Sequence, residues 1–404
     1  MKALFITHDG LTDPLGESQV LTYVRGLAKL GHEMHVLSCE KPLRFSEHEN
    51  RIRELTKDDL IDWHPLPYCT SIPVYSQFRN YSQLLKQAKK LHRVHKFDLI
   101  HCRSYLAGMV GRNIKQLSGT PYIFDMRGFW PDERVEGKVW NLKNPVFRSI
   151  YLFFKYQEKK LLIAANHTVT LTFEAKREIW SWKLTPKNIP ITVIPCCVDL
   201  NLFDPSKISK NREDLRTELG LGIDDFVLVY LGSVGTWYLL EEMLDFFKSV
   251  LKERPSAKFL FISHDNEIIL NACRSRNIDP SSIIIKAGTR EQVPSLVASA
   301  DLGIFFIKPV YSKKASSATK CAELLAMGLP LIANEGVGDN DSLFAQSEIG
   351  LLVKSFSEEN YHKAIRLIPE LLKLTPENIR KTAEQNFSLA HALRQYQNVY
   401  SSIE

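Results

Sequence analysis

Short apolar runs alternate with helical patterns along this chain of 404 residues. Between the runs, apolar positions recur as one face of a helix over residues 18–30, 81–95, 105–117 and 144–164. The runs themselves predict β-strands at 2–7, 33–38, 97–102, 121–125, 167–172 and 191–194. Strands that alternate with helices form parallel sheets covered by helices. The first half of the chain therefore predicts a Rossmann-like domain.

A second alternation of strands and helices begins at Asp225. It predicts strands at 226–232, 258–263, 282–288, 301–307 and 330–334, and helices at 239–252, 291–299 and 318–327. The polar stretch 200–224 between the two alternations is the best linker candidate. A final helix near 387–401 either stays with the second half or crosses back onto the first.

These patterns predict an α/β protein of two Rossmann-like, doubly wound parallel-sheet domains, 1–200 and 201–386. Residues 387–404 would complete the first domain if the last helix crosses back. Ligands in such sheets bind beyond the carboxyl ends of the strands. We therefore expect a central cleft faced by both domains, and we look for functional residues in the loops that follow strands.

The composition is that of an ordinary globular protein, with 44% hydrophobic and 24% charged residues. No apolar run approaches the roughly 18 residues of a membrane span, and the N-terminal run resembles a core strand rather than a signal peptide. The seven cysteines are scattered, without zinc-ligand spacing, as expected for reduced thiols. We expect a cytoplasmic protein without a structural metal.

The positive charge is concentrated in the first half, where residues 1–200 carry +9 and the remainder −3. The densest basic stretch is Lys86–Lys96, and the segment Asn144–Lys155 places Phe, Tyr and Leu among basic residues. Two interpretations stay open, namely a solvated basic face with ordinary core aromatics, or docking on an anionic membrane surface. Nucleic acid is not expected as a partner, because no recognition module accompanies the charge.

Two loops of the first half contain candidate site residues. Gly16 lies directly before a helix, where backbone N–H groups can face an anion, although an ordinary turn explains it equally well. Asp125 and Arg127 follow a strand, either as a structural ion pair or, given their place at the expected cleft, as catalytic residues. The chain has no G-x-G-x-x-G or Walker A motif, which argues against a dinucleotide oxidoreductase and a P-loop NTPase.

In the second half, a loop after a strand carries two glycines with hydroxyls around them, a composition that suits close approach to phosphate oxygens. Its residues are Gly232, Ser233, Gly235 and Thr236. The stronger segment is the helix start near 316–323, where free N–H groups can cradle a diphosphate. It offers Ser317 and Thr319 at the helix start, Lys320 as a positive charge in the first turn, and Glu323 one turn deeper as an acceptor for ribose hydroxyls. Each residue alone could serve ordinary helix capping.

Four separated runs together resemble glycosyltransferase family 4: RGLAKLGHEMHVLS (25–38), VIPCCVDLNLF (193–203), REQVPSLVASADLGIFF (290–306) and KCAELLAMGLPLIAN (320–334). The resemblance covers most of the chain and implies the GT-B fold and retaining transfer from a nucleotide-sugar donor. It also implies that Gly16 approaches the donor phosphate and that Gly232, Ser233 and Gly235 lie beside the diphosphate. Arg290, Glu291 and Val293 would border the nucleoside base, and Glu323 would hold the ribose.

The chain departs from the family pattern in three places. Ala315 stands where many members carry a glutamate that touches the donor sugar. The glycine loop continues into Thr236-Trp237-Tyr238, without the Arg and Lys that often hold the diphosphate, so Lys320 would stand in for them. The N-domain histidine of several members has no clear match.

We therefore predict a glycosyltransferase that moves a sugar from a nucleotide diphosphate sugar to an acceptor on the basic first domain. The acceptor would be a lipid-linked or glycan intermediate of cell-surface polysaccharide synthesis, because such acceptors are common in the family. That acceptor also favours peripheral membrane docking. No metal or other cofactor is expected, and the D-x-D of Asp339–Asp341 lies where a GT-B enzyme needs none. The alternatives are a non-catalytic sugar-nucleotide-binding protein and a nucleotide-sugar 2-epimerase of the same fold.

Overall fold

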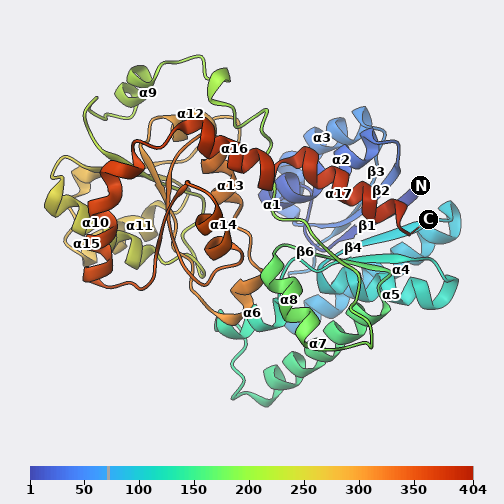
Figure 1. The fold of residues 1–404 in the computed structure, drawn as a ribbon. Helices are drawn as coiled ribbons and strands as arrows, with labels where there is room; N and C mark the ends of the chain where they lie inside the picture. The colour runs from blue at the N-terminus through green and yellow to red at the C-terminus, as the bar shows by residue number, and fades with distance from the viewer. Residues whose placement is uncertain (71–72, 404) are drawn as a thin grey trace. The chain divides into compact units, whose positions relative to one another are not determined.

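The computed structural model describes residues 1–70 and 73–403, which fold into two compact units. The first unit contains residues 1–195 and the C-terminal stretch from Ala392, and the second contains Cys196–His391. Each unit holds one fully parallel sheet with helices packed on it (Figure 1). The structure thus has two doubly wound α/β units, the fold class that the alternation of strands and helices predicts.

The sheet of the first unit has the strand order β3-β2-β1-β4-β5-β6-β7. Its strands are β1(Lys2–Thr7), β2(Glu33–Glu40), β3(Asp62–Pro67), β4(Leu99–Arg103), β5(Tyr122–Asp125), β6(His167–Thr170) and β7(Ile191–Val193). The middle strands β1 and β4 are buried along almost their whole length, as expected for a parallel sheet covered on both faces. Six of the seven strands were expected; β3 contains two prolines and lies at the edge, so its apolar signal is weak.

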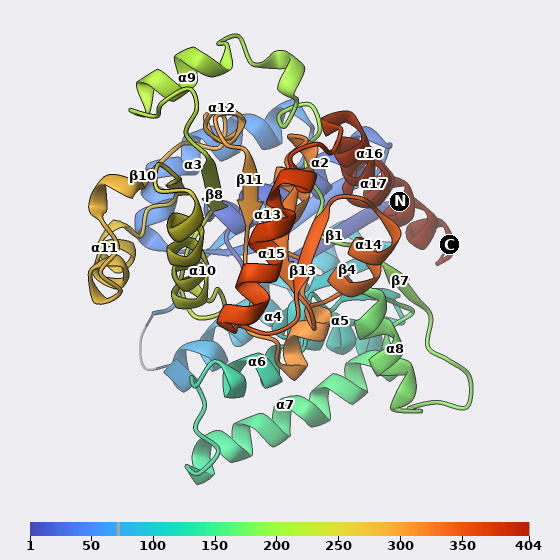
Figure 2. The ribbon, with the colours of Figure 1, turned by 60° about the vertical axis from the view of Figure 1, so that its left-hand side comes forward.

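The helices of the first unit are α1(Pro14–Gly16), the π-helical turn η1(Glu17–Leu21), α2(Thr22–Lys29), α3(Pro42–Asp58), α4(Pro73–His95), α5(Ser104–Ser118), α6(Trp130–Glu136), α7(Pro145–Ala164) and α8(Phe173–Ser181). The helix expected at 18–30 is therefore interrupted near its start by η1. Helix α7 begins where Asn144 accepts a hydrogen bond from the N–H of Val146 at 2.9 Å. Figure 2 shows α7 as a long helix along one edge of this unit, beside α6.

The sheet of the second unit has the order β10-β9-β8-β11-β12-β13. Its strands are β8(Val227–Leu231), β9(Lys258–Ile262), β10(Ile283–Lys286), β11(Leu302–Ile304), β12(Leu331–Asn334) and β13(Gly350–Val353). Its helices are η2(Pro205–Lys207), α9(Arg212–Glu218), α10(Leu240–Glu253), α11(Asn266–Ser275), η3(Pro280–Ser282), α12(Val293–Ala298), η4(Tyr311–Ala315), α13(Thr319–Ala326), α14(Asn340–Gln346), α15(Glu358–Leu371) and α16(Pro376–Phe387).

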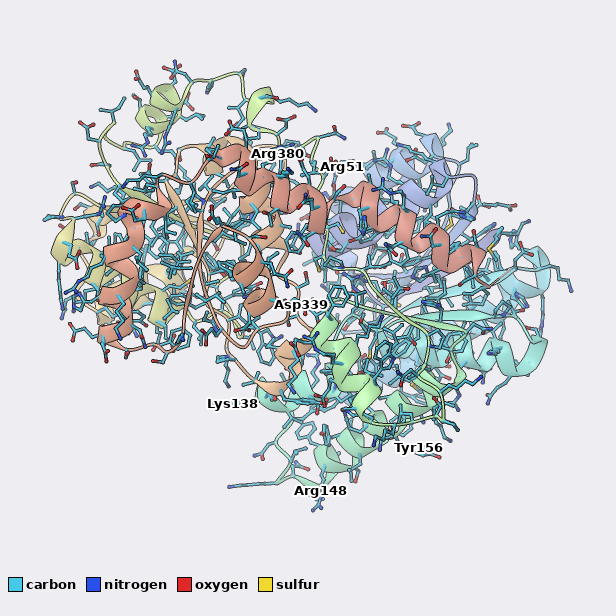
Figure 3. The ribbon with its side chains drawn as sticks, in the orientation of Figure 1. Arg51, Lys138, Arg148, Tyr156, Asp339 and Arg380 are labelled. Carbon is cyan, nitrogen blue, oxygen red and sulfur yellow. The ribbon has the colours of Figure 1, made fainter. Side chains whose placement is uncertain are left out.

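The stretch 200–224, expected as a linker, folds onto the second unit instead. Arg216 of α9 is buried, and its guanidinium donates to Asp301 Oδ2 at 2.8 Å and to the carbonyl of Ser299 at 3.0 Å. Arg380 of α16, labelled in Figure 3, donates to the carbonyls of Leu200, Phe203 and Ala326. Polar anchors of this kind leave no apolar periodicity in the sequence, which explains why the stretch resembles a linker.

The last helix, α17(Leu389–Ser401), packs on the first unit from Ala392 onward. Figure 1 shows it alongside α2, where Leu393 methyl groups occupy the space that a side chain at Gly26 would need. Gln397 Oε1 lies 2.7 Å from His32 Nε2, and Tyr400 Oη lies 2.9 Å from His101 Nδ1. The chain end thus contributes buried aromatic residues to the first unit.

Across residues 1–70 and 73–403, every helix is either too short or too polar to cross a lipid bilayer.

Candidate functional site

The loop after β8 has the backbone geometry expected of a close approach. Gly232 has φ +98°, a conformation that side chains disfavour, and Thr236 adopts φ +47° despite its β-branched side chain. Asp265 Oδ2 accepts the N–H of Val234 at 2.8 Å and holds the loop. A Cβ on Gly235 would meet nothing closer than Ser233 Oγ at 3.8 Å. Packing within the protein therefore does not require glycine at 235.

Helix α13 starts at Thr319, and no side chain among the described residues caps its amino end. Its first N–H groups and the helix dipole favour an anion at this end. Ser317, also expected at the helix start, has a different contact, because its Oγ accepts the N–H of Cys196 at 3.1 Å. Thr319 and the dipole thus remain as the groups of this helix start that suit a phosphate.

Lys320 links this helix to the glycine loop. Its Nζ donates to Tyr230 Oη at 2.6 Å, and Tyr230 Oη in turn donates to the carbonyl of Ser233. The ammonium lies 3.9 Å from the ring centroid of Tyr230 and 3.2 Å from that of Tyr238. It is also 3.7 Å from the position of a Cβ on Gly232. The structure therefore brings Lys320 together with the loop 232–236.

Burial governs the protonation of Lys320. Its side chain is enclosed, and this burial lowers its pKa well below the usual range, although the negative charge of Glu323 acts in the opposite direction. The full charge expected from the sequence is thus disfavoured here. A phosphate oxygen beside Nζ would restore it.

Glu323 and Arg290 form an ion pair at the next turn of α13. Arg290 Nη1 donates to Glu323 Oε1 at 2.9 Å, and the guanidinium lies 5.4 Å from the ring centroid of Phe203. Burial raises the pKa of Glu323, and Arg290 counteracts part of that effect. The residues assigned to ribose and base are therefore adjacent. Glu291 is exposed and Val293 half-buried at the start of α12.

Asp125 ends β5 in the first unit and is enclosed there, with 1% of its side chain exposed. Its Oδ2 accepts from Tyr396 Oη at 3.1 Å and lies 3.8 Å from His101 Nε2 and 4.0 Å from Arg103 Nη1. Arg127 Nη1 is 3.7 Å from Oδ1. Burial opposes ionisation, but Arg127, His101 and Arg103 outweigh it and hold the pKa of Asp125 below its usual value.

Arg127 itself adopts φ +61°, and its Nη2 donates to Gln19 Oε1 of η1 at 3.4 Å. The structure thus brings Asp125 and Arg127 together as an ion pair within a network that joins β5, η1 and α17. In this conformation Asp125 could influence a substrate only through its neighbours. Its catalytic role, and that of Arg127, stay predictions.

Several members of this network were not singled out from the sequence. His101 and Arg103 lie two positions apart on β4, and they therefore point to the same face of the sheet. Polar residues with that spacing in an otherwise apolar strand are the signal that could have found them. Tyr396 has no such signal, since only the course of α17 places it beside Asp125.

Gly16 is held against the first loop of this unit. A Cβ on Gly16 would lie 1.7 Å from the carbonyl oxygen of Gly10, so no other residue fits. The buried Glu40 clamps the same loop, because its carboxylate accepts the N–H groups of Leu11 and Thr12 at 2.8 and 3.1 Å. A structural reason alone thus accounts for glycine at 16, and its contact with a donor phosphate stays a prediction.

No group of three His, Cys, Asp or Glu side chains suited to a metal ion occurs within the described parts of the chain. In the D-x-D segment, Asp341 Oδ2 accepts the N–H of Gly336 at 3.0 Å, a local turn contact. Ala315, at the position of the family glutamate, is buried in η4.

Comparison with known proteins covers both units. The model described as Glycosyltransferase Family 4 matches residues 16–202, and that described as Glycosyl transferases group 1 matches 211–386. A galactosyltransferase of Escherichia coli, UDP-Gal:alpha-D-GlcNAc-diphosphoundecaprenol alpha-1,3-galactosyltransferase, is 22% identical over 82% of this chain and 81% of its own length.

Two solved structures share the fold. Sucrose-phosphate synthase from Thermosynechococcus elongatus superposes with a TM-score of 0.76 at 17% identity, covering 100% of this chain and 99% of that one. HepE from Anabaena, solved with UDP and glucose, superposes with a TM-score of 0.68 at 14% identity over 100% of both chains. These likenesses concern the fold of both units.

Proposed function

Because this chain belongs to glycosyltransferase family 4, with matches over both units, we propose that it transfers a sugar from a nucleotide diphosphate donor to a lipid-linked or glycan acceptor. The second unit would bind the donor and the basic first unit the acceptor. The observation that carries the donor assignment is the chain of contacts from Lys320 through Tyr230 to the carbonyl of Ser233. It joins the buried lysine of α13 to the glycine loop.

The diphosphate would lie between the loop 232–236 and the amino end of α13. There the helix dipole, the N–H groups of the first turn and Lys320 would stabilise the leaving phosphate as its charge grows in the transition state. Such stabilisation accelerates transfer because the charge is larger in the transition state than in the donor. Glu323, one turn deeper, would exchange its contact with Arg290 for ribose hydroxyls.

Retention of the anomeric configuration is part of the proposal. No carboxylate of the described donor-side loop or of α13 other than Glu323 is placed to act as a nucleophile, and Glu323 is assigned to the ribose. Departure of the diphosphate and attack by the acceptor on the same face of the sugar would then replace a covalent intermediate. The anomeric configuration of the product, read by NMR, tests this step.

The names of the relatives suggest the first substrates to test. The E. coli relative acts by name on UDP-Gal and a diphosphoundecaprenol-linked sugar, and HepE was solved with UDP. We propose a polyprenyl-diphosphate-linked acceptor and test UDP-sugars first. Incubation of donor with and without acceptor is the assay. Transfer that requires acceptor supports the proposal, whereas conversion of the donor sugar without acceptor would indicate an epimerase. Binding without turnover under either condition would indicate a non-catalytic protein.

An enzyme that uses a lipid-linked acceptor must contact the membrane surface. Helix α7 has a side suited to that contact. Phe154 is buried, but the outer side of the same helix exposes apolar side chains: Val146, Leu152, Phe153, Tyr156 and Ile163. Figure 3 shows Arg148 and Tyr156 on this helix, and Lys160 Nζ lies 4.2 Å from the ring centroid of Tyr156. Apolar residues beside cations are typical of helices that lie in the interface of an anionic bilayer. We propose that α7 docks there.

Co-sedimentation with phosphatidylglycerol vesicles tests this docking. We expect binding at low salt that weakens as salt rises, because four or five engaged cations contribute about 4–5 kcal/mol at low ionic strength. Leu152→Glu should reduce binding, whereas Leu43→Glu on the exposed side of α3 is the matched control. Equal recovery with neutral and anionic vesicles would contradict the docking.

A further inference from the structure

The first unit contains a cavity of about 740 Å³ between α4, α5, α6 and α7. This volume is within the range of about 300–1,000 Å³ that small-molecule sites occupy. Its wall is mainly aromatic and aliphatic, and Leu106, Met109, Trp140, Ile150 and Phe154 contribute to it. Such a wall favours a hydrocarbon over a sugar, because a sugar would lose its hydrogen bonds to water there.

Three rings form one side of the cavity. The ring centroid of Trp130 lies 5.3 Å from that of Trp140 and 4.8 Å from that of Phe154, both edge to face. The contacts fix the rings against one another and stabilise a preformed shape. The cavity is therefore built into the packing of α6 and α7.

The outer end of the cavity reaches the exposed apolar side of α7. Phe153 is 46% exposed, lies on that side of the helix and also lines the cavity. Phe78 of α4 lines it as well and is 69% exposed. A hydrocarbon chain leaving a bilayer beside Phe153 would thus meet a side chain that also forms part of the cavity wall.

The cavity wall beside Trp130 carries a cation, Arg134. The guanidinium of Arg134 lies 5.1 Å from the ring centroid of Trp130, and within the described residues no carboxylate is in ion-pair distance of it. The pKa of His8, the residue directly after β1, is lowered mainly by burial, and the positive charge of Arg134 lowers it further. Tyr68 lines the cavity and has its ring 5.1 Å from that of His8. The part of the cavity lined by Tyr68 therefore adjoins the carboxyl edge of the sheet, where substrates of parallel sheets bind.

We propose that this cavity holds the hydrocarbon chain of the acceptor lipid, with the phosphate at its head against Arg134. The inference rests on the proposed transfer to a lipid-linked acceptor and names the part of the first unit that recognises the lipid. The charge complementarity of Arg134 to phosphate, and the continuity of the wall with the outer side of α7, select this occupant. The reacting sugar would then be presented at the carboxyl edge of the sheet.

Calorimetric titration with farnesyl diphosphate, farnesol and inorganic diphosphate tests the proposal. We expect farnesyl diphosphate to bind most tightly, farnesol more weakly and inorganic diphosphate weakest. Saturating UDP should leave the farnesyl diphosphate affinity unchanged, because UDP is assigned to the second unit. Displacement of farnesyl diphosphate by UDP would overturn the proposal. UDP binding in the same preparation reports on the proposed function separately.

Variants locate the site. Ser149→Trp places a large ring into the cavity and should weaken farnesyl diphosphate and farnesol by at least about tenfold, the effect of excluding about two methylene groups. Ser46→Trp on α3 is the matched control, since both serines are exposed and bond a carbonyl of their own helix. Phe153→Ser, which removes part of the exposed wall, should act in the same direction if Ser149→Trp does not fold.

Arg134→Gln should weaken farnesyl diphosphate about tenfold and leave farnesol unchanged, with Arg93→Gln on α4 as its control. Wild-type affinity for farnesyl diphosphate in Ser149→Trp and Phe153→Ser would overturn the assignment of the cavity. Equal loss of farnesol and farnesyl diphosphate in Arg134→Gln would overturn the contact with phosphate.

Discussion

Tyr396 Oη donates a hydrogen bond to Asp125 Oδ2 at 3.1 Å and thereby joins the last helix to the carboxyl end of β5. Both side chains are almost completely buried. Asp125 also balances the charges of Arg103 and Arg127. A carboxylate so placed supports the fold around it, whatever its role in transfer.

Tyr396→Phe should lower the free energy of unfolding by about 1–3 kcal/mol, because it leaves the buried carboxylate short of one donor. Asp125→Asn should cost more, about 3–5 kcal/mol, since the guanidinium groups of Arg103 and Arg127 each lose an ion-pair partner in an enclosed site, although Asp9 stays 3.5 Å from Arg103. Chemical denaturation measures both. Tyr156→Phe, exposed on α7, is the control and should change stability by less than about 0.5 kcal/mol.

The same variants separate folding from catalysis at Asp125 and Arg127. If the pair orients a substrate, Asp125→Asn and Arg127→Lys should lower transfer per folded molecule, measured where the variants are fully folded. Intact transfer with a lowered melting temperature would assign the pair to the fold alone.

The two glycines assigned to donor binding should respond differently to alanine. Gly235→Ala has room for its methyl group, so it should leave stability unchanged while weakening donor binding if phosphate oxygens approach the loop. Gly16→Ala should cost at least about 3 kcal/mol, because its methyl group would collide with the backbone of Gly10. Thermal unfolding and donor titration of both variants make the comparison. If Gly235→Ala binds the donor with unaltered affinity, the phosphates do not approach the loop at Gly235.

Glu323→Gln should weaken donor binding by about 1–3 kcal/mol, since a charged acceptor for the ribose hydroxyls becomes neutral. Calorimetry measures the change. Glu348→Gln, an exposed glutamate outside the loop and α13, serves as the control. If both variants bind donor like the parent protein, Glu323 does not hold the ribose and its role is the ion pair with Arg290.

Donor binding should be linked to proton uptake at Lys320. Burial lowers the pKa of this lysine in the free protein, and a diphosphate beside Nζ would raise it. Between the lowered pKa and the raised one, binding takes up a proton, so affinity should fall as pH rises through that window. Below the pKa that Lys320 has in the free protein, the lysine is already protonated, so donor binding no longer takes up a proton. Titrations in two buffers of different ionisation enthalpy measure the uptake, which Lys320→Met should abolish.

The sequence predicted much of the fold, because buried parallel strands such as β4 and β8 are short, mainly apolar runs that alternate with helical patterns. It linked Lys320 to the loop 232–236 through the family resemblance, because the loop lacks the usual Arg and Lys and Lys320 would stand in for them. It could not show that Lys320 is buried between Tyr230 and Tyr238, because burial depends on packing between β8 and α13.

The polar network around Asp125 could not be predicted from the sequence for a related reason. His101 and Arg103 leave a trace in the alternation of β4, but Tyr396 reaches Asp125 only through the return of α17 to the first unit. The stretch 200–224 was misinterpreted as a linker because arginines, rather than apolar residues, hold it to the second unit. Polar side chains that join distant segments leave no periodic pattern in the sequence from which their contacts could be predicted.

Lys320→Met should lower turnover more than the affinity for the sugar donor, because the diphosphate carries its largest charge as it leaves. Steady-state kinetics give both quantities. A variant with normal turnover and only a raised KM would assign Lys320 to binding of the ground state.

Lys320 and the loop 232–236 should together bind the diphosphate of a nucleotide. The most direct test titrates UDP, GDP and ADP, each beside its own nucleoside, into the parent protein and Lys320→Met. We predict that one diphosphate binds the parent at least about tenfold more tightly than its nucleoside, and that Lys320→Met removes most of this difference. No preference for any diphosphate over its nucleoside, or an equal preference in both proteins, would contradict the account.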